Sequence, residues 1–396
     1  MIRWAIIIGL ICTAGQAWAG PADTKVKLCF KYEVDYRDRA VGDWTDTTMI
    51  ARGVYFYVQN KTTGSKTFHW ASKETGCTTL TLNARYRYSI RMQSKAKVTN
   101  DNIITLRVSP DNPINYGWTA DADFSPMQKA GRVSTFTWPT HPGGDYSIRV
   151  SNIIAAASFS LHRRYGGLKN KTFVAYREPC NPSGGSCLKN DPNGGLAVFL
   201  SASGGTRNKF QISHEIGHLL AAKRNQNERT NTSGYGLTHQ SNDKASQCAD
   251  ANDDYKHHFY SEEYVSSAAN EGLAHFYAAA IWNSPNDNDC DWYSYYDGST
   301  ISCETGRKYL INTCYGGQEP KLDTGNELDW MRFWWDVHTD CDINFEPIMD
   351  IWDRSNPHKW KDRKVVRKIM RAARKRLNKK DYRCLKNEAI GNGVKW

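Results

Sequence analysis

Two histidines and a glutamate interrupt the otherwise apolar stretch FQISHEIGHLLAAK at residues 210–223. His214 and His218 are four residues apart, so on a helix their rings share one face and can bind a single ion. Imidazole nitrogens suit zinc, which lowers the pKa of a bound water to near neutrality. Glu215 directly follows the first histidine and can take that proton and return it to a leaving amine. The HEIGH spacing therefore predicts a hydrolytic zinc site with Glu215 as general base.

A catalytic zinc site needs a third protein ligand and an open position. In one pattern the third ligand is a His just downstream of HExxH, preceded by a Gly at a fixed position. That pattern is excluded here, because Ala221 and Arg224 occupy those two positions. Glu271 is the best candidate, since an acid within the apolar stretch AANEGLAHFYAAAIW loses its hydration unless it is paired or metal-bound. Alternatives lie in the polar stretch before it: His239, Asp243, His257, His258, Glu262 and Glu263.

Over roughly residues 148–340 the chain resembles the gluzincin, or thermolysin-like, zinc metallopeptidases. The resemblance implies that His214, His218 and Glu271 bind zinc and that Glu215 is general base and acid. It makes Asn270 and Glu271 the family's Asn-Glu pair. It also implies that the strand GLAVFL lines the cleft and pairs with an extended peptide substrate.

Two features depart from the thermolysin pattern. The interval from His218 to Glu271 is longer than in that enzyme, and His275 stands where it has an aspartate. His275 could support a ligand, donate to the oxyanion or bind the metal itself. A tyrosine or histidine usually stabilises the oxyanion in such enzymes, and the choice among Tyr264, Tyr277 and His338 stays open.

The elements that position these residues follow from periodicity. From about residue 25 to residue 150, β-branched and aromatic residues alternate in short runs, which predicts strands and a sandwich. Helices are predicted at residues 151–167, from an N-cap near Thr206 through HEIGH, at 260–282 and at 327–338, with strands at 171–178 and 195–203. The expected fold class is α+β. A β-sandwich at 20–147 precedes a zincin-like metallopeptidase domain at 148–396, whose active-site helix packs on a small sheet.

The N-terminal twenty residues, MIRWAIIIGLICTAGQAWAG, have the composition of a secretory signal peptide. Arg3 precedes a short apolar run, and the small residues Ala17 and Ala19 predict cleavage after residue 19. The run is too short for a transmembrane anchor. A secreted protein, extracellular or periplasmic, is therefore expected.

The cysteines agree with export. Ten of the 11 cysteines remain after the signal peptide, and an even number in an exported chain favours disulfides. Pairing between sequence neighbours, Cys180 with Cys187 and Cys303 with Cys314, is the working expectation.

The positive charge is concentrated in one segment. The formal net charge is +11, and the stretch from Lys359 to Lys380 holds 12 Lys and Arg residues against one acid, Asp362. Its apolar residues recur at helical spacing, which predicts an amphipathic helix with a solvated cationic face. The other interpretation is that this face binds an anionic surface such as phospholipid or polysaccharide. Nucleic acid is not expected as the partner of an exported protein.

Together these features favour a secreted zinc endopeptidase that acts on protein or peptide substrates. The alternative from another class is a secreted binding or adhesion protein whose zincin domain is catalytically silent. The presence of Glu215 favours the enzyme, because a silent relative could lose this base at no cost to binding. A third interpretation keeps the chemistry but places the cleaved amide in the cell envelope.

Overall fold

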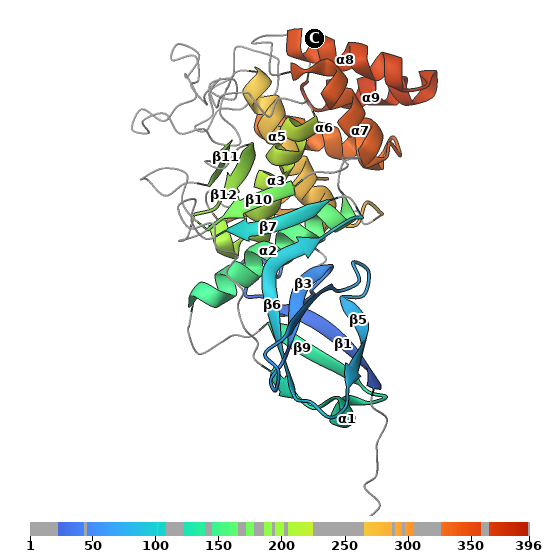
Figure 1. Ribbon diagram of the computed structural model, residues 1–396. Coiled ribbons are helices and arrows are strands. Elements are labelled where there is room, and N and C mark those ends of the chain that lie inside the picture. The colour runs from blue at the N-terminus through green and yellow to red at the C-terminus, as the bar shows by residue number, and fades with distance from the viewer. Residues whose placement is uncertain are drawn as a thin grey trace, which may run out of the picture.

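The chain folds into a mixed α+β arrangement with several sheets, shown in Figure 1. This computed structural model describes residues 23–42, 46–100, 102–107, 122–138, 145–164, 172–177, 186–191, 195–201, 205–224, 265–286, 290–294, 298–304, 326–357 and 364–394. The strands are β1 Asp23–Glu33, β2 Thr48–Ile50, β3 Val54–Asn60, β4 Lys66–Trp70, β5 Cys77–Asn83, β6 Tyr88–Lys97, β7 Ile103–Arg107, β8 Ala122–Phe124, β9 Val133–Trp138, β10 Thr172–Tyr176, β11 Cys187–Asn190, β12 Leu196–Phe199, β13 Asp291–Tyr293 and β14 Thr300–Ser302. The helices are α1 Pro126–Lys129, α2 Asp145–Arg163, the 3-10 turn η1 Gly205–Arg207, α3 Lys209–Arg224, α5 Val265–Trp282, α6 Glu327–Thr339, α7 Phe345–Ser355, α8 Lys364–Arg376 and α9 Lys379–Gly391.

The N-terminal strands form two sheets with a shared apolar interior. One sheet has the order β2-β1-β5, with β9 parallel to β1. Alternate residues of β1 are buried, as the period of two predicts. The ring of Phe30 on β1 lies 4.5 Å from Phe56 on β3 and 5.9 Å from Phe136 on β9. Since β3 belongs to the other sheet, these rings join the two.

The second sheet extends across the predicted domain boundary. It has eight strands, in the order β11-β12-β10-β7-β6-β3-β4 with β8 beside β6. β7 pairs in parallel with β10, which follows it in the chain by more than sixty residues. The strands expected to form a separate small sheet therefore continue the N-terminal one. The division of the chain at residue 148 does not coincide with a break in this sheet.

The first helix begins earlier than its pattern suggested. Residues 145–150, DYSIRV, were expected to end the β part, but they form the first turns of α2. Their alternation has only three apolar positions, and the apolar run that follows at helical spacing continues through them.

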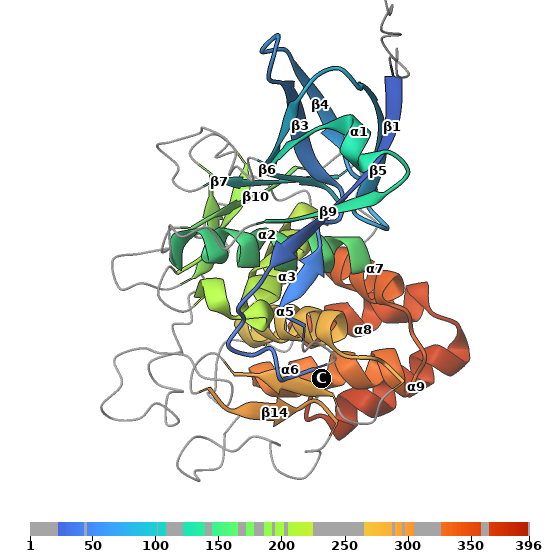
Figure 2. The same cartoon turned by 90° about the horizontal axis from the view of Figure 1, so that it is seen from below.

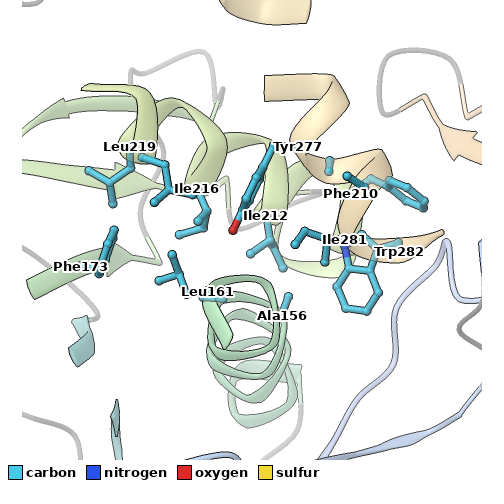
Figure 3. Packing of buried hydrophobic residues seen from close by; sticks show 14 of the residues in the cluster. Ala156, Leu161, Phe173, Phe210, Ile212, Ile216, Leu219, Tyr277, Ile281 and Trp282 are labelled. Carbon is cyan, nitrogen blue, oxygen red and sulfur yellow. The ribbon is translucent and has the colours of Figure 1, made fainter. Parts of the chain in front are cut away.

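Helices pack in layers on one face of the eight-stranded sheet. Phe173 on β10, Leu161 on α2 and Ile216 on α3 belong to one core, as Figure 3 shows. Figure 2 shows α2, α3, α5 and α6 in successive layers away from the strands, with α7, α8 and α9 to one side. On the opposite face of β10 and β12, Val174, Tyr176, Ala197 and Phe199 form a separate small cluster.

A residue that follows β1 holds the start of α3. The Asp38 carboxylate accepts hydrogen bonds from the backbone amides of Lys209 and Phe210, each at 3.1 Å. The Asn208 side chain accepts from the Gln211 amide at 2.8 Å, as an N-cap does. The predicted N-cap, Thr206, was wrong, because it lies in the 3-10 turn before the helix.

We expect Asp38→Ala to lower the free energy of unfolding by about 2–4 kcal/mol, because two buried amides lose their acceptor. Burial, partly offset by Lys209 and the two amides, raises the pKa of Asp38 from 3.8 to about 6. The folded-state pKa thus exceeds the unfolded one, so this carboxyl's contribution to stability is greatest below pH 4 and falls as the pH rises through 6. Urea unfolding should show a larger loss at pH 5 than at pH 7.5. The exposed Asp46→Ala is the control, and an unchanged midpoint in Asp38→Ala would contradict the capping role.

Three disulfides are found among the described residues: Cys29–Cys77, Cys290–Cys303 and Cys341–Cys384. The expected pair Cys303–Cys314 was wrong, because the β13–β14 hairpin places Cys303 opposite Cys290. Cys187 is also disulfide-bonded, whereas Cys180 lies outside the described residues. The disulfides are consistent with an extracellular protein. In the described ranges, no helix has the length and hydrophobicity needed to cross a membrane, and the predicted signal peptide lies outside them.

The basic segment forms α8, and its last two residues, Lys379 and Lys380, begin α9. Asn378 separates them and caps α9 by accepting from the Asp381 amide at 2.9 Å. The apolar side of α8 is buried, as its pattern predicted. Its outer side exposes six cations: Lys364, Arg367, Arg371, Arg374, Lys375 and Arg376.

Candidate metal centre

Two helices bring together the three residues predicted to bind a metal. His214 and His218 are on α3, and Glu271 is on α5. The two Nε2 atoms lie 3.0 Å apart, and each is 3.1 Å from Oε2 of Glu271. All three side chains are buried. The alternatives for the third ligand, His239, Asp243, His257, His258, Glu262 and Glu263, lie outside the described residues.

The three donor atoms fit a small tetrahedral cation. Ligands about 2.0–2.1 Å from zinc at tetrahedral angles are separated by about 3.3 Å, close to the observed triangle. Two ring nitrogens and a carboxylate that face each other away from water need a positive charge between them. A bound zinc ion would supply that charge.

The electrostatics of the triangle agree with this fit. Burial, together with the nearby rings of His275 and His218, lowers the pKa of His214 well below its usual value. Burial also acts to lower the pKa of His218, but the Glu271 carboxylate outweighs it and raises that pKa to about 9. A cation bound at the three donors must therefore displace a proton held by His218 and Glu271.

Asn270 supports the tautomer that a metal requires. Its Nδ2 lies 3.1 Å from Nδ1 of His218, while its Oδ1 has no hydrogen-bond partner among the residues that the structure describes. Rotating the Asn270 amide by 180° exchanges Nδ2 with Oδ1, so that Oδ1 accepts a hydrogen bond from a protonated Nδ1 of His218. The lone pair of Nε2 then points to the other donors, as in metal-binding histidines.

Glycines allow the three helices to approach closely. A Cβ on Gly217, within HEIGH, would lie 3.0 Å from Cα of Ala274 on α5. A Cβ on Gly272 would lie 2.7 Å from the Glu327 carbonyl oxygen and 2.9 Å from the Met331 nitrogen on α6. Both glycines adjoin the metal-site residues in sequence, so the close crossings set where Glu271 lies.

We expect Gly272→Ala to lower the free energy of unfolding by about 1–3 kcal/mol, because the methyl group overlaps the α6 backbone and the helices must separate. Gly391→Ala is the matched control, since this helical glycine has open space around it. Thermal unfolding of both variants gives the comparison. Equal stability would show that the α5–α6 crossing can relax.

His275 lies beside the triangle, together with an acid that the sequence did not single out. Its Nε2 is 3.0 Å from Oε2 of Glu327, and both residues are fully buried. The His275 ring lies 4.3 Å from His214, between centroids, and 4.7 Å from Trp292. Because the His275 ring contacts both His214 and Trp292, it limits how far the His214 ring can turn. The sequence signal that could have singled out Glu327 is the capping box of α6. Asn326 and Asp329 mark the start of this helix, so Glu327 lies in its first turn.

The candidates for oxyanion stabilisation are engaged elsewhere or undescribed. The Tyr277 hydroxyl donates to the Arg164 carbonyl at 2.9 Å, and its ring packs in the core of Figure 3. Nδ1 of His338 lies 2.9 Å from the Ile343 carbonyl. Tyr264 lies outside the described residues.

The strand expected to pair with substrate is not at a sheet edge. GLAVFL forms β12, which pairs with β10 on one side and β11 on the other. The apolar run that identifies this strand in the sequence does not show whether other strands pair with both of its edges. Among the described strands, β11 is the terminal one at this end of the sheet.

No protein-family model and no curated protein sequence matches the chain. The donor triangle and its surroundings are therefore the basis of the functional conclusion.

Proposed function

We propose that the protein is a secreted zinc endopeptidase of the gluzincin type, with a β-sandwich joined to a zincin-like domain. The observation that carries the proposal is the triangle of His214, His218 and Glu271, with atoms 3.0–3.1 Å apart. Glu215 follows the first of these residues on the same helix and is also buried.

The metal ligands and the general base are different residues in this proposal. His214, His218 and Glu271 hold the zinc, which when bound acts as a Lewis acid toward water and the substrate carbonyl. Glu215 takes a proton from the attacking water and gives it to the leaving amine. The negative charge of Glu215 also helps to raise the pKa of His218. Asn270 and His275 orient the two imidazoles.

Substrate and surface contacts come from other elements. We infer that an extended peptide pairs with the outer edge of β11, because β12 has neighbours on both sides. For α8, burial of the apolar side supports the structural interpretation. Attachment to an anionic surface through its exposed cations stays a proposal.

The test is metal content and hydrolysis measured on the same sample. The purified chain should contain about one zinc per molecule by elemental analysis, as one set of three ligands predicts. Its hydrolysis of casein or gelatin should be lost with 1,10-phenanthroline and restored by zinc but not by magnesium. Hydrolysis that persists without metal, or a chain that binds no zinc, would contradict the proposal.

A further inference from the structure

Four aromatic rings lie side by side on β3 and β4: Phe68 is exposed, Tyr55 and Trp70 are half-buried, and Tyr57 is buried. Tyr55 pairs with Trp70 and Tyr57 with Phe68 across the two strands. The Tyr55 ring lies 5.7 Å from Phe68, nearly parallel to it, and 4.5 Å from Trp70, and Tyr57 lies 5.6 Å from Phe68. Phe68 is 52% exposed and lies among other aromatic rings rather than singly.

Cations surround these rings. Lys66 lies 5.0 Å and Arg91 5.8 Å from the Tyr57 ring, and Lys95 lies 5.3 Å from Tyr55 and 5.7 Å from Trp70. Three strands, all described, provide the outward positions: Tyr55, Tyr57, Gln59, Lys66, Phe68, Trp70, Arg91, Gln93, Lys95 and Lys97. None of these is acidic. We call the four rings with Lys66, Arg91 and Lys95 the aromatic platform.

The aromatic platform is separate from the metal centre. Lys95 pairs with Thr105 of β7, Thr105 with Val174 of β10, and Val174 belongs to the cluster opposite the helices. The neighbouring Phe173 faces α2 and α3 instead. The platform thus lies on the other face of the sheet from α3, at the end formed by β4.

We propose that the aromatic platform is a binding site for an acidic polysaccharide, one whose sugars carry carboxylate groups. The C–H face of a pyranose ring is apolar and flat, so it stacks on an aromatic ring, while neighbouring cations pair with the carboxylates. A membrane would need several apolar side chains to project, whereas only Phe68 projects from the sheet and the other three rings are half-buried or buried. Single-stranded nucleic acid uses similar surfaces, but the disulfides are typical of compartments outside the cytosol.

The test is binding of the full chain to polygalacturonate, measured by affinity electrophoresis, with dextran as the neutral polymer and a single-stranded oligonucleotide as competitor. We expect binding to polygalacturonate, weakened by salt and absent with dextran. Phe68→Ser should weaken it at least 5-fold, roughly one lost stacking contact. Combining it with Lys95→Gln should weaken it further.

Matched variants away from β3 and β4 separate the aromatic platform from general charge and from folding. Ile390 on α9 is 54% exposed, so Ile390→Ser removes an equally exposed apolar side chain. Lys25→Gln with Lys27→Gln removes two exposed cations from β1, which belongs to the other sheet. Both should bind like the unaltered chain. Equal losses in these control variants, no binding to polygalacturonate, or stronger binding to the oligonucleotide would each overturn the proposal.

Discussion

Glu215→Gln should abolish peptide hydrolysis and leave the zinc content unchanged. Glutamine has the size of glutamate but cannot take a proton, and loss of a general base lowers kcat by about 10²–10⁴-fold. The three donor atoms of the triangle are not altered by this change. Elemental analysis and casein hydrolysis on the same preparation measure the two properties separately.

Glu74→Gln is the control for this change, because it removes a carboxylate from an exposed acid of the N-terminal part. It should retain both zinc and activity. If Glu215→Gln hydrolyses casein as fast as the unaltered chain, the enzyme interpretation fails. A zinc-loaded chain in which neither form is active would instead favour the binding or adhesion protein with a silent site.

Glu271→Ala should lose the metal, with zinc affinity reduced by more than about 100-fold. Loss of an outer-shell partner alone costs about 10–100-fold in metal affinity, and here a direct ligand is removed. Two imidazoles from one helix then remain. Zinc retained after dialysis, measured by elemental analysis, gives the result, and circular dichroism confirms that the variant is folded.

The discriminating control is Glu327→Gln. Glu327 is as buried as Glu271 and belongs, with Glu271 and His275, to a second group whose donor atoms lie within 4.8 Å of one another. As a partner of His275 rather than a ligand, it should retain more zinc than Glu271→Ala. The opposite order, with zinc lost from Glu327→Gln and kept by Glu271→Ala, would move the third ligand to the second group.

The parts of the site that are local in sequence could be predicted from it. His214 and His218 had to share a face once the apolar run was helical, because one turn separates them. Glu271 was identified because an acid amid alanine and leucine needs a buried partner, and the structure brings it to both histidines. The helices at α5 and α6 followed from the same periodicity.

The long-range features could not be predicted in this way. The pairing of β7 with β10 and the choice of β11 as the terminal strand depend on register between distant segments, which no local pattern records. The partner of Cys303 depends on the β13–β14 hairpin. In the sequence, Glu327 is an ordinary acid in the first turn of a helix. The close crossing of α5 and α6 at Gly272 brings it into contact with His275, and the sequence does not record that crossing.

Strands from before and after residue 145 share one sheet, so proteolytic cleavage between the two parts would affect that sheet. Proteolytic removal of everything before residue 145 would take five of the eight strands and the aspartate that holds the start of α3. The remaining fragment would lose the surface on which α2 packs. The N-terminal part therefore belongs to the same fold as the helices, and we expect its removal to destabilise α2 and the start of α3.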